Sequence, residues 1–387
     1  MATAELAPAL ARPRFRAGWI AGPWTDLPWL IGGALTGYAL FALYASMPHQ
    51  MDTIWLVWYV LLDIPHFFGT YLRTYLDPVE RRRRPLLIYG SLAFLLVGPA
   101  TILACCALFA AGSKLYLAPL AVLGAFVILW AYWHVVRQHY GIMSLYKRKN
   151  ADNAPADNWL DKSLLYVGLV VPFVSLALRH PQARAIFALP DEPAPWEWIV
   201  TVGGPALVAL IAAAFLARQA DLLRRGEAVN LPKVLLLLAV VPLHLFVAYH
   251  PAMLATNVLF FGAFVTIFHD VQYHAIVWHA QQAKFSRPDT DRSKHGLAGW
   301  ISRHFALYAV AALLMGASAW FVGCSLDIRP GCVPLVKTAE YPLFGDLTLE
   351  HLLLVTVSGM ILHHYFVDGY IWRPSKDAEV RKDLKVA

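Results

Sequence analysis

Long runs of apolar residues constrain this chain more than any other feature of its sequence. A membrane-spanning helix needs roughly 20 mostly apolar residues, and runs of that kind recur along most of the 387 residues. Hydrophobic residues make up 59% of the chain and charged residues only 15%, against about 25% charged in an average soluble domain. This composition excludes a disordered chain, a coiled coil and an ordinary soluble enzyme. The candidate spans are residues 27–47, 52–76, 85–112, 115–146, 162–179, 196–218, 233–250, 252–280, 297–323 and 348–372.

These runs predict an all-α fold, a polytopic transmembrane helical bundle with about ten spans. Their length and continuity exclude a closed β-barrel, the other architecture that satisfies its backbone in lipid. We expect a cytoplasmic N-terminal segment at 1–26, a single bundle domain at 27–372 and a cytoplasmic tail at 373–387. We also expect the chain to be a multi-pass protein of the bacterial inner (plasma) membrane.

Lys and Arg are distributed unequally between alternate loops of this map. The loops on the side of the N-terminus carry most of them, including the four Arg residues at 81–84. Since basic residues are enriched in cytoplasmic loops, this bias indicates an even number of spans with both termini inside. The net charge of +7 is therefore mainly a topology signal, and we expect contact with anionic membrane lipids and not with nucleic acid. Cys324 and Cys332 fall in one predicted outer loop and are candidates for a disulfide bond.

Histidines gather in four of the even-numbered spans, although the chain has 15 of them in all. In the expected topology, each even span runs from outside to inside, and each motif lies about 7–22 Å before its cytoplasmic end by helical rise. Four helices that are far apart in sequence would therefore place polar groups at one depth. The motifs contain Asp63 and His66; His134 and His139; His269, Asp270 and His274; and His363, His364 and Asp368.

Carboxylates reinforce this pattern. Of the 25 Asp and Glu residues, only Asp63, Asp270 and Asp368 fall well inside predicted spans, and all three belong to the His motifs. An ionisable group in hydrocarbon costs at least about 2.5 kcal/mol and usually marks a functional site. We therefore expect these carboxylates and histidines to neutralise one another or to share a cation.

The spacing within the motifs leaves two arrangements open. His134 and His139, like His269 and His274, are five residues apart, which separates them by about 140° on a regular helix. A π-helical turn would bring such a pair onto one face. On a regular helix, the pair would bracket a cavity, or one member would bind a metal and the other would act from outside the coordination sphere. In the second span, we expect Pro65 to bend the helix.

The motifs offer enough ligands for two metal ions. Mixed imidazole and carboxylate ligands suit non-haem iron, with Zn or Cu as alternatives, and iron activates dioxygen. Asp270, Tyr273 and Arg137 are candidate catalytic residues. Asp270 would orient a metal ligand or serve as one, Tyr273 would orient ligands, and Arg137 would pair with a carboxylate or an anionic head group. The candidate metal ligands are Asp63, His66, His134, His139, His269, His274, His363, His364 and Asp368.

Two of these motifs resemble those of a known class of enzymes. The segment H-VVRQ-H at His134 and His139 resembles the first His box of the integral-membrane, His-rich diiron enzymes, such as desaturases and hydroxylases of fatty acids and sterols. His363 and His364 resemble the end of a later His box. The resemblance covers motif type and side of the membrane. It implies two iron ions, dioxygen as oxidant and a lipidic or hydrophobic substrate. No flavin or iron–sulfur motif is present in the sequence, so a cytosolic donor would supply electrons at the basic loops.

Two other functions compete with an oxidoreductase. A transporter of metal ions or protons would use the same Asp and His groups as a relay, but it needs polar groups along a route to both faces. The outer halves of these even spans are almost wholly apolar. A haem protein for electron transfer needs facing single histidines, and carboxylates crowd the histidines here. We therefore favour a metal-dependent membrane oxidoreductase over both alternatives.

Overall fold

The structure, a computed structural model, describes residues 14–327 and 334–386, and these residues are almost entirely helical. The expected pair Cys324 and Cys332 lies outside this range, because Cys332 falls in the gap. The strands are β1 (Phe15–Arg16), β2 (Val229–Asn230), β3 (Pro342–Phe344) and β4 (Leu347–Thr348). The helices are α1 (Pro23–Thr25), η1 (Asp26–Ile31), α2 (Ala34–Ser46), η2 (Pro48–Gln50), α3 (Met51–Trp58), η3 (Tyr59–Asp63), α4 (Ile64–Arg73), α5 (Pro78–Arg83), α6 (Pro85–Gly90), η4 (Ser91–Leu96), α7 (Val97–Ala110), α8 (Ala118–Lys149), α9 (Pro155–Arg179), α10 (Pro181–Ile186), η5 (Ile199–Gly203), α11 (Gly204–Arg224), α12 (Leu231–Tyr249), α13 (Pro251–Leu254), α14 (Phe260–Phe285), η6 (Arg292–His295), α15 (Gly296–Ile301), α16 (Phe305–Ser325), η7 (Thr338–Glu340), α17 (Leu349–Ile371) and α18 (Ala378–Leu384).

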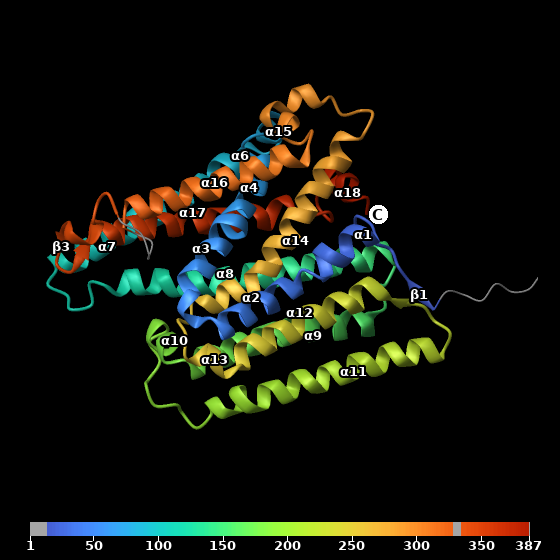
Figure 1. The fold of residues 1–387 in the computed structure, drawn as a ribbon, viewed down its shortest axis with the longest axis horizontal. Helices are drawn as coiled ribbons and strands as arrows, with labels where there is room; N and C mark the ends of the chain where they lie inside the picture. The colour runs from blue at the N-terminus through green and yellow to red at the C-terminus, as the bar shows by residue number, and fades with distance from the viewer. Residues whose placement is uncertain (1–13, 328–333, 387) are drawn as a thin grey trace, which may run out of the picture.

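Eight helical segments in the described part of the chain are long and apolar enough to cross a membrane. They correspond to eight of the ten predicted windows, and they confirm the helical bundle predicted from the sequence. Two outer groups of helices flank α4 and α14: α7, α16 and α17 on one side, and α2, α9, α11 and α12 on the other (Figure 1). The eight segments are Pro23–Ser46, Pro85–Ala110, Ala118–Lys149, Pro155–Arg179, Ile199–Arg224, Leu231–Tyr249, Phe305–Ser325 and Leu349–Ile371.

The two remaining windows, 52–76 and 252–280, also form helices, but these are not among the eight apolar segments. The first is the continuous path of α3, η3 and α4, and the second is the 26-residue helix α14. Both carry His and Asp side chains inside the bundle, and these lower the hydropathy of the helices. The π-helical turn η3 ends just before Pro65, where a bend was predicted. Pro65 has no N–H to donate, and the wider turn accommodates this loss.

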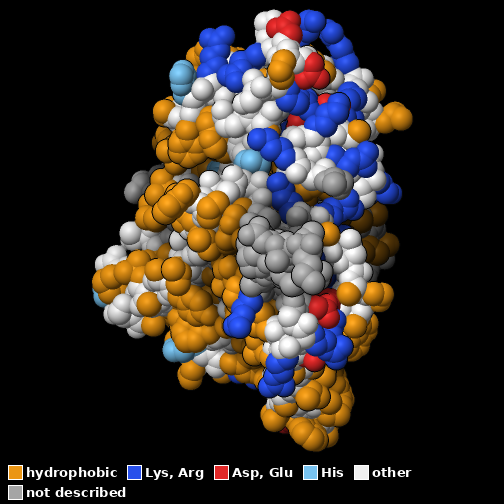
Figure 2. Space-filling model, turned by 90° about the vertical axis from the view of Figure 1, so that its right-hand side faces the viewer, with side chains coloured by type: hydrophobic (Ala, Val, Ile, Leu, Met, Phe, Trp, Pro, Cys, Tyr) orange, Lys and Arg blue, Asp and Glu red, His pale blue; other side chains and the backbone are white. Residues whose placement is uncertain are grey.

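Both described ends of the chain lie at the same end of the bundle (Figure 1). Figure 2 views that end directly and shows Lys and Arg gathered on it, with hydrophobic side chains along the flanks. Near the N-terminus, β1 pairs in parallel with β2. Asn150 at the end of α8 accepts a hydrogen bond from the N–H of Gly18 at 2.8 Å. These contacts fix the start of the described chain to the ends of α8 and α12.

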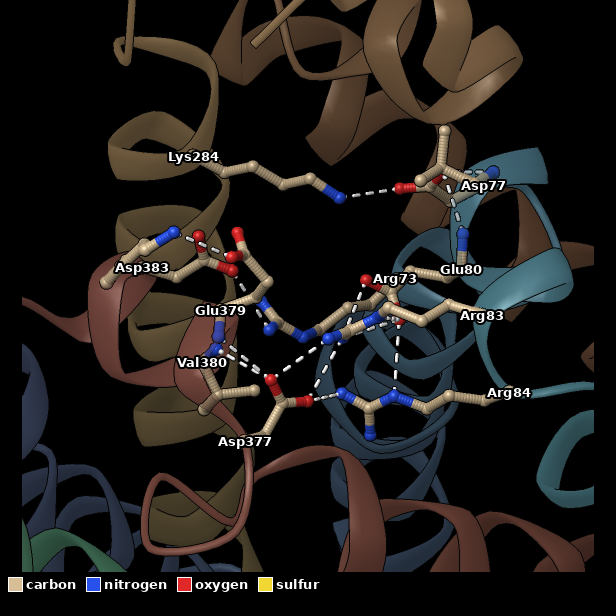
Figure 3. A network of polar contacts seen from close by, with 12 residues as sticks. Arg73, Asp77, Glu80, Arg83, Arg84, Lys284, Asp377, Glu379, Val380 and Asp383 are labelled. Carbon is tan, nitrogen blue, oxygen red and sulfur yellow. Dashed lines mark hydrogen bonds and ion pairs between the residues drawn. The ribbon is translucent and has the colours of Figure 1, made fainter. Parts of the chain in front are cut away.

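The segment after α17 returns to the bundle as α18, whose side chains Val380 and Leu384 are buried. Ion pairs hold it there (Figure 3). Asp383 on α18 lies 3.1 Å from the guanidinium of Arg73 on α4. Asp377, at the start of α18, pairs with Arg83 at 3.0 Å and also with Arg84. The chain end therefore covers the bundle close to the polar helices α4 and α14.

The same end of the bundle gives a testable pH dependence at Asp77. Burial raises the pKa of the Asp77 carboxyl, but Lys284 at 2.8 Å and His295 at 2.8 Å outweigh burial and lower it below 3.8. Because the folded pKa lies below the unfolded one, the carboxylate stabilises the fold at higher pH. This contribution is lost as the pH falls through the folded pKa.

We expect Asp77→Asn to lower the free energy of unfolding by about 3–5 kcal/mol at neutral pH, because Lys284 is left buried without its partner. Asn retains the side-chain acceptor for the N–H of Val79, so the helix cap of α5 survives. Unfolding in detergent, followed across pH, should show the difference between the two proteins shrinking below about pH 4. A difference that stays constant down to the lowest pH would contradict this role of the carboxylate.

Candidate metal centre

Four buried histidines from four helices meet inside the bundle. They are His66 on α4, His134 on α8, His269 on α14 and His364 on α17. The ring of His66 lies 5.1 Å from that of His269 and 4.8 Å from that of His364. The ring of His134 lies 4.9 Å from that of His269 and 5.4 Å from that of His364. The structure thus brings together one histidine from each predicted motif.

Two buried carboxylates complete this cluster. Oδ1 of Asp270 lies 3.1 Å from Nδ1 of His66. Oδ2 of Asp368 lies 3.8 Å from Nε2 of His364 and 4.0 Å from Nε2 of His134. Three protein ligands with open positions are typical of catalytic metal sites. Two groups could each hold a metal ion through ligand atoms within 4.8 Å of one another: His66, His269 and Asp270; and His134, His364 and Asp368.

Several polar atoms of the cluster are buried without a hydrogen-bond partner among the described residues. A bound metal ion would supply the missing partner. Within the described chain, Nε2 of His134, Nδ1 of His269 and Oδ2 of Asp368 make no hydrogen bond. Nδ1 of His66 and Oδ1 of Asp270 are close, but their geometry is not that of a hydrogen bond. An unsatisfied buried polar group costs about 1–3 kcal/mol, and a cation in each group would remove that cost.

The other oxygen of each carboxylate is held by neighbouring side chains. Oδ1 of Asp368 accepts hydrogen bonds from Thr70 at 2.6 Å and Tyr273 at 2.8 Å. Oδ2 of Asp270 accepts one from the indole N–H of Trp58 at 3.0 Å. Each carboxylate is therefore fixed through one oxygen, while the other faces the histidines. This is the usual arrangement around metal ligands, whose orientation is set by partners outside the coordination sphere.

Thr70 also determines which nitrogen of His364 can bind a metal. Its hydroxyl proton goes to Asp368, so its oxygen accepts a hydrogen bond from Nδ1–H of His364 at 2.9 Å. A neutral imidazole with Nδ1 protonated has its lone pair on Nε2. Nε2 of His364 lies 3.0 Å from Nε2 of His66, inside the cluster. Sequence reasoning missed Thr70, although it lies four residues after His66 and so shares its helix face.

We expect Thr70→Val to lower metal affinity by about 10–100-fold, as loss of an outer partner of a metal ligand does. Equilibrium dialysis of the purified protein against a metal buffer measures this effect. Thr74→Val is the matched control, because Thr74 is equally buried and loses one hydrogen bond, to the backbone oxygen of Thr70. Equal metal affinity in the two variants would contradict the proposed role of Thr70.

Three predicted ligands lie on other helix faces. His139 packs against the rings of His244 and Phe268. Both α8 and α14 run as regular α-helix through their H-x4-H segments, so the paired histidines point about 140° apart. The other two predicted ligands bond to tyrosines. His274 Nδ1 lies 2.7 Å from the hydroxyl of Tyr308, and His363 Nε2 lies 2.9 Å from the hydroxyl of Tyr75.

Two further predicted residues lie outside both ligand groups. Asp63 ends η3 and lines a cavity next to the cluster. Arg137 donates a hydrogen bond to the hydroxyl of Tyr166 at 2.6 Å, and its guanidinium lies over the ring of Tyr140. Asp270 and Tyr273, by contrast, lie at the cluster. The structure therefore gathers four histidines, two carboxylates and one tyrosine from the predicted set.

No protein-family model, curated protein or solved structure matches the chain. The cluster presents imidazole and carboxylate ligands in two adjoining groups, buried from water and fixed by hydrogen bonds.

Proposed function

We propose that the chain is a membrane-embedded, metal-dependent oxidoreductase that binds two iron ions and uses dioxygen to oxidise a lipidic or hydrophobic substrate. The observation that carries the proposal is the pair of buried three-residue groups, in which every residue except His364 has an inward atom with no hydrogen-bond partner among the described residues. Imidazole with carboxylate suits non-haem iron. When bound, iron would supply the redox chemistry that activates dioxygen. The protein would hold the ions, exclude water and position the substrate.

A cavity of about 680 Å³ next to the cluster supports a hydrophobic substrate. Most of its lining is apolar. On the side of the cluster it is bounded by Phe67, whose ring stacks on His364 at 3.9 Å, and by Tyr365, whose ring stacks on His134 at 4.5 Å. A single layer of aromatic rings therefore separates the cavity from the ligands. Cavities of this size and character hold drug-sized apolar ligands.

Gly262 offers a way to fill this cavity without disturbing the metal ligands. It lines the cavity on α14, and a side chain there would meet open space. We expect Gly262→Phe to weaken binding of a fluorescent fatty acid at least tenfold, about 1.4 kcal/mol, without changing metal content. The control is Gly141→Phe, at an exposed position on α8 that also has open space. Unchanged fatty-acid binding in Gly262→Phe would argue against a substrate in this cavity.

We propose ten crossings with both termini in the cytoplasm of a bacterium, in its inner membrane. The common location of both described ends and the Lys and Arg on that face support this orientation. Both α14 and the path from α3 to α4 have the length that a crossing requires. The variants Arg148→Cys and Lys337→Cys, each with that cysteine as its single thiol, should react with a membrane-impermeant thiol reagent from opposite sides of the membrane. Labelling of both from the same side would contradict the topology.

Oxygen consumption tests the reaction itself. Iron-loaded protein in detergent, supplied with a chemical reductant and a mixed membrane-lipid extract, should consume dioxygen faster than metal-free protein. Transport of ferrous ion into proteoliposomes without dioxygen consumption would contradict the proposal and favour a metal transporter, the other use of buried Asp and His groups.

A further inference from the structure

A second cavity, of about 610 Å³, lies between η1, α4, α14 and α16. None of the residues that line it also lines the substrate cavity. It includes residues near the start of the described chain, such as Ala21 and Thr25, so it lies toward the end of the bundle where both described ends are found. The two cavities therefore approach the polar helices from different faces.

The lining of this second cavity combines aromatic rings with hydrogen-bonding groups. Its polar side chains include His274, which contacts the hydroxyl of Tyr308 at 2.7 Å, and Gln282. His279 also lines it, and Nε2 of His279 is buried without a hydrogen-bond partner among the described residues. Besides Tyr308, the aromatic side chains are Trp29, Trp278 and Phe305, and the rest of the lining is largely aliphatic.

Such a lining suits an amphiphile with a flat, hydrogen-bonding head and an apolar tail. Indole and phenyl rings stack on a planar head, and the imidazole and hydroxyl groups can bond to oxygens at its edge. The aliphatic side chains Leu61, Leu62 and Leu313 provide an apolar continuation. A phospholipid head group is bulky and ionic, and it matches the rings less well than a planar one.

The cavity is close to the metal-binding groups through the same two helices. Pro65 and Val271 line it, and their chain neighbours are the predicted ligands His66 and Asp270. His274 lies one helical turn beyond Asp270, about 6 Å along α14. A redox carrier in this cavity would therefore be separated from the ligands by little more than the helices that carry them.

We propose that this cavity binds a quinol, which reduces the metal centre from within the membrane. The proposal rests on the proposed function and replaces the cytosolic donor expected from the sequence. Oxygenation of a substrate breaks one C–H bond, forms one C–O bond and releases the second oxygen atom as water. That reaction consumes two electrons and two protons beyond dioxygen. One quinol supplies the two electrons and the two protons and leaves as quinone. His279 accepts a hydrogen bond from one hydroxyl group of the bound quinol.

Ligand binding can be tested without metal. Decylubiquinone should quench part of the tryptophan fluorescence of the wild-type protein saturably, because two of its 14 tryptophans, Trp29 and Trp278, line the cavity. We expect His279→Leu to weaken this binding at least tenfold, whereas His304→Leu, an exposed histidine that does not line the cavity, should leave it unchanged. Ala309→Trp, which fills the cavity, should abolish binding even if His279→Leu alters the fold. Saturable binding of a fatty acid or phospholipid, with none of decylubiquinone, would overturn the quinol assignment.

Electron transfer is the second test. Under anaerobic conditions, decylubiquinol should reduce the iron-loaded wild-type protein by two electrons per chain, as measured by absorption. The Ala309→Trp protein should be reduced by dithionite but not by decylubiquinol. Reduction of both proteins at equal rates would overturn the role of this cavity. A failure of the proposed function would show separately, as absence of iron in the elemental analysis of a protein that still binds decylubiquinone.

Discussion

His364→Ala is expected to remove bound metal from the protein. Nε2 of His364 carries a lone pair that faces the cluster, and it lies 3.0 Å from His66 and 3.8 Å from Asp368. Removing a ligand should reduce affinity by more than the roughly 10–100-fold that loss of an outer partner costs. Elemental analysis after dialysis should therefore find the variant depleted of metal, and dioxygen consumption should fall with it.

The neighbouring His363 is the matched control. It is also buried, but its Nε2 bonds to the hydroxyl of Tyr75, away from both ligand groups. His363→Ala should retain wild-type metal content. Metal loss in both variants would indicate a general effect on folding, and full metal content in His364→Ala would contradict its role as a ligand.

Asp161→Asn is expected to cause a large loss of stability. The carboxylate of Asp161 is fully buried between α8, α9 and α12, where it pairs with Lys233 at 3.1 Å and with Lys147. Asn at this position would leave the buried ammonium groups of Lys147 and Lys233 with Asp152 as their one remaining carboxylate partner among the described residues. Breaking a buried ion pair costs about 3–5 kcal/mol, and thermal unfolding in detergent measures the loss.

Glu340→Gln controls for removal of a charge as such. Glu340 pairs with Lys337 at 3.1 Å, but both side chains are mostly exposed. Exposed ion pairs contribute about 0–1 kcal/mol, so this variant should unfold close to the wild type. Equal stability of the two variants would show that the buried network contributes little.

The sequence predicted the framework of the bundle because the hydropathy and the length of each apolar run can be taken directly from the order of its residues. It also predicted that the His motifs of four helices would lie at one depth, since that requires only topology and helical rise. It did not determine which histidine of each motif faces inward. That choice depends on the rotation of each helix about its axis, which packing sets. In α8, for example, regular helix turns His139 away from the cluster.

Residues that support the ligands were harder to find from the sequence. Thr70 and Trp58 belong to none of the predicted His motifs, and only the structure shows that they donate hydrogen bonds to Asp368 and Asp270. The two cavities could likewise not be predicted from the sequence, because each is lined by helices that are distant in sequence. The eight apolar segments were identified by composition, whereas α14 and the path from α3 to α4 fall outside them because the His and Asp side chains of the site lower their hydropathy.

Elemental analysis of the wild-type protein, purified without chelators and examined by absorption spectroscopy, tests the central claim most directly. The two buried groups of His and Asp predict two iron ions per chain and no Soret band. A wild-type protein with no more metal than the variant His66→Ala/His364→Ala would contradict the account, as would stoichiometric haem.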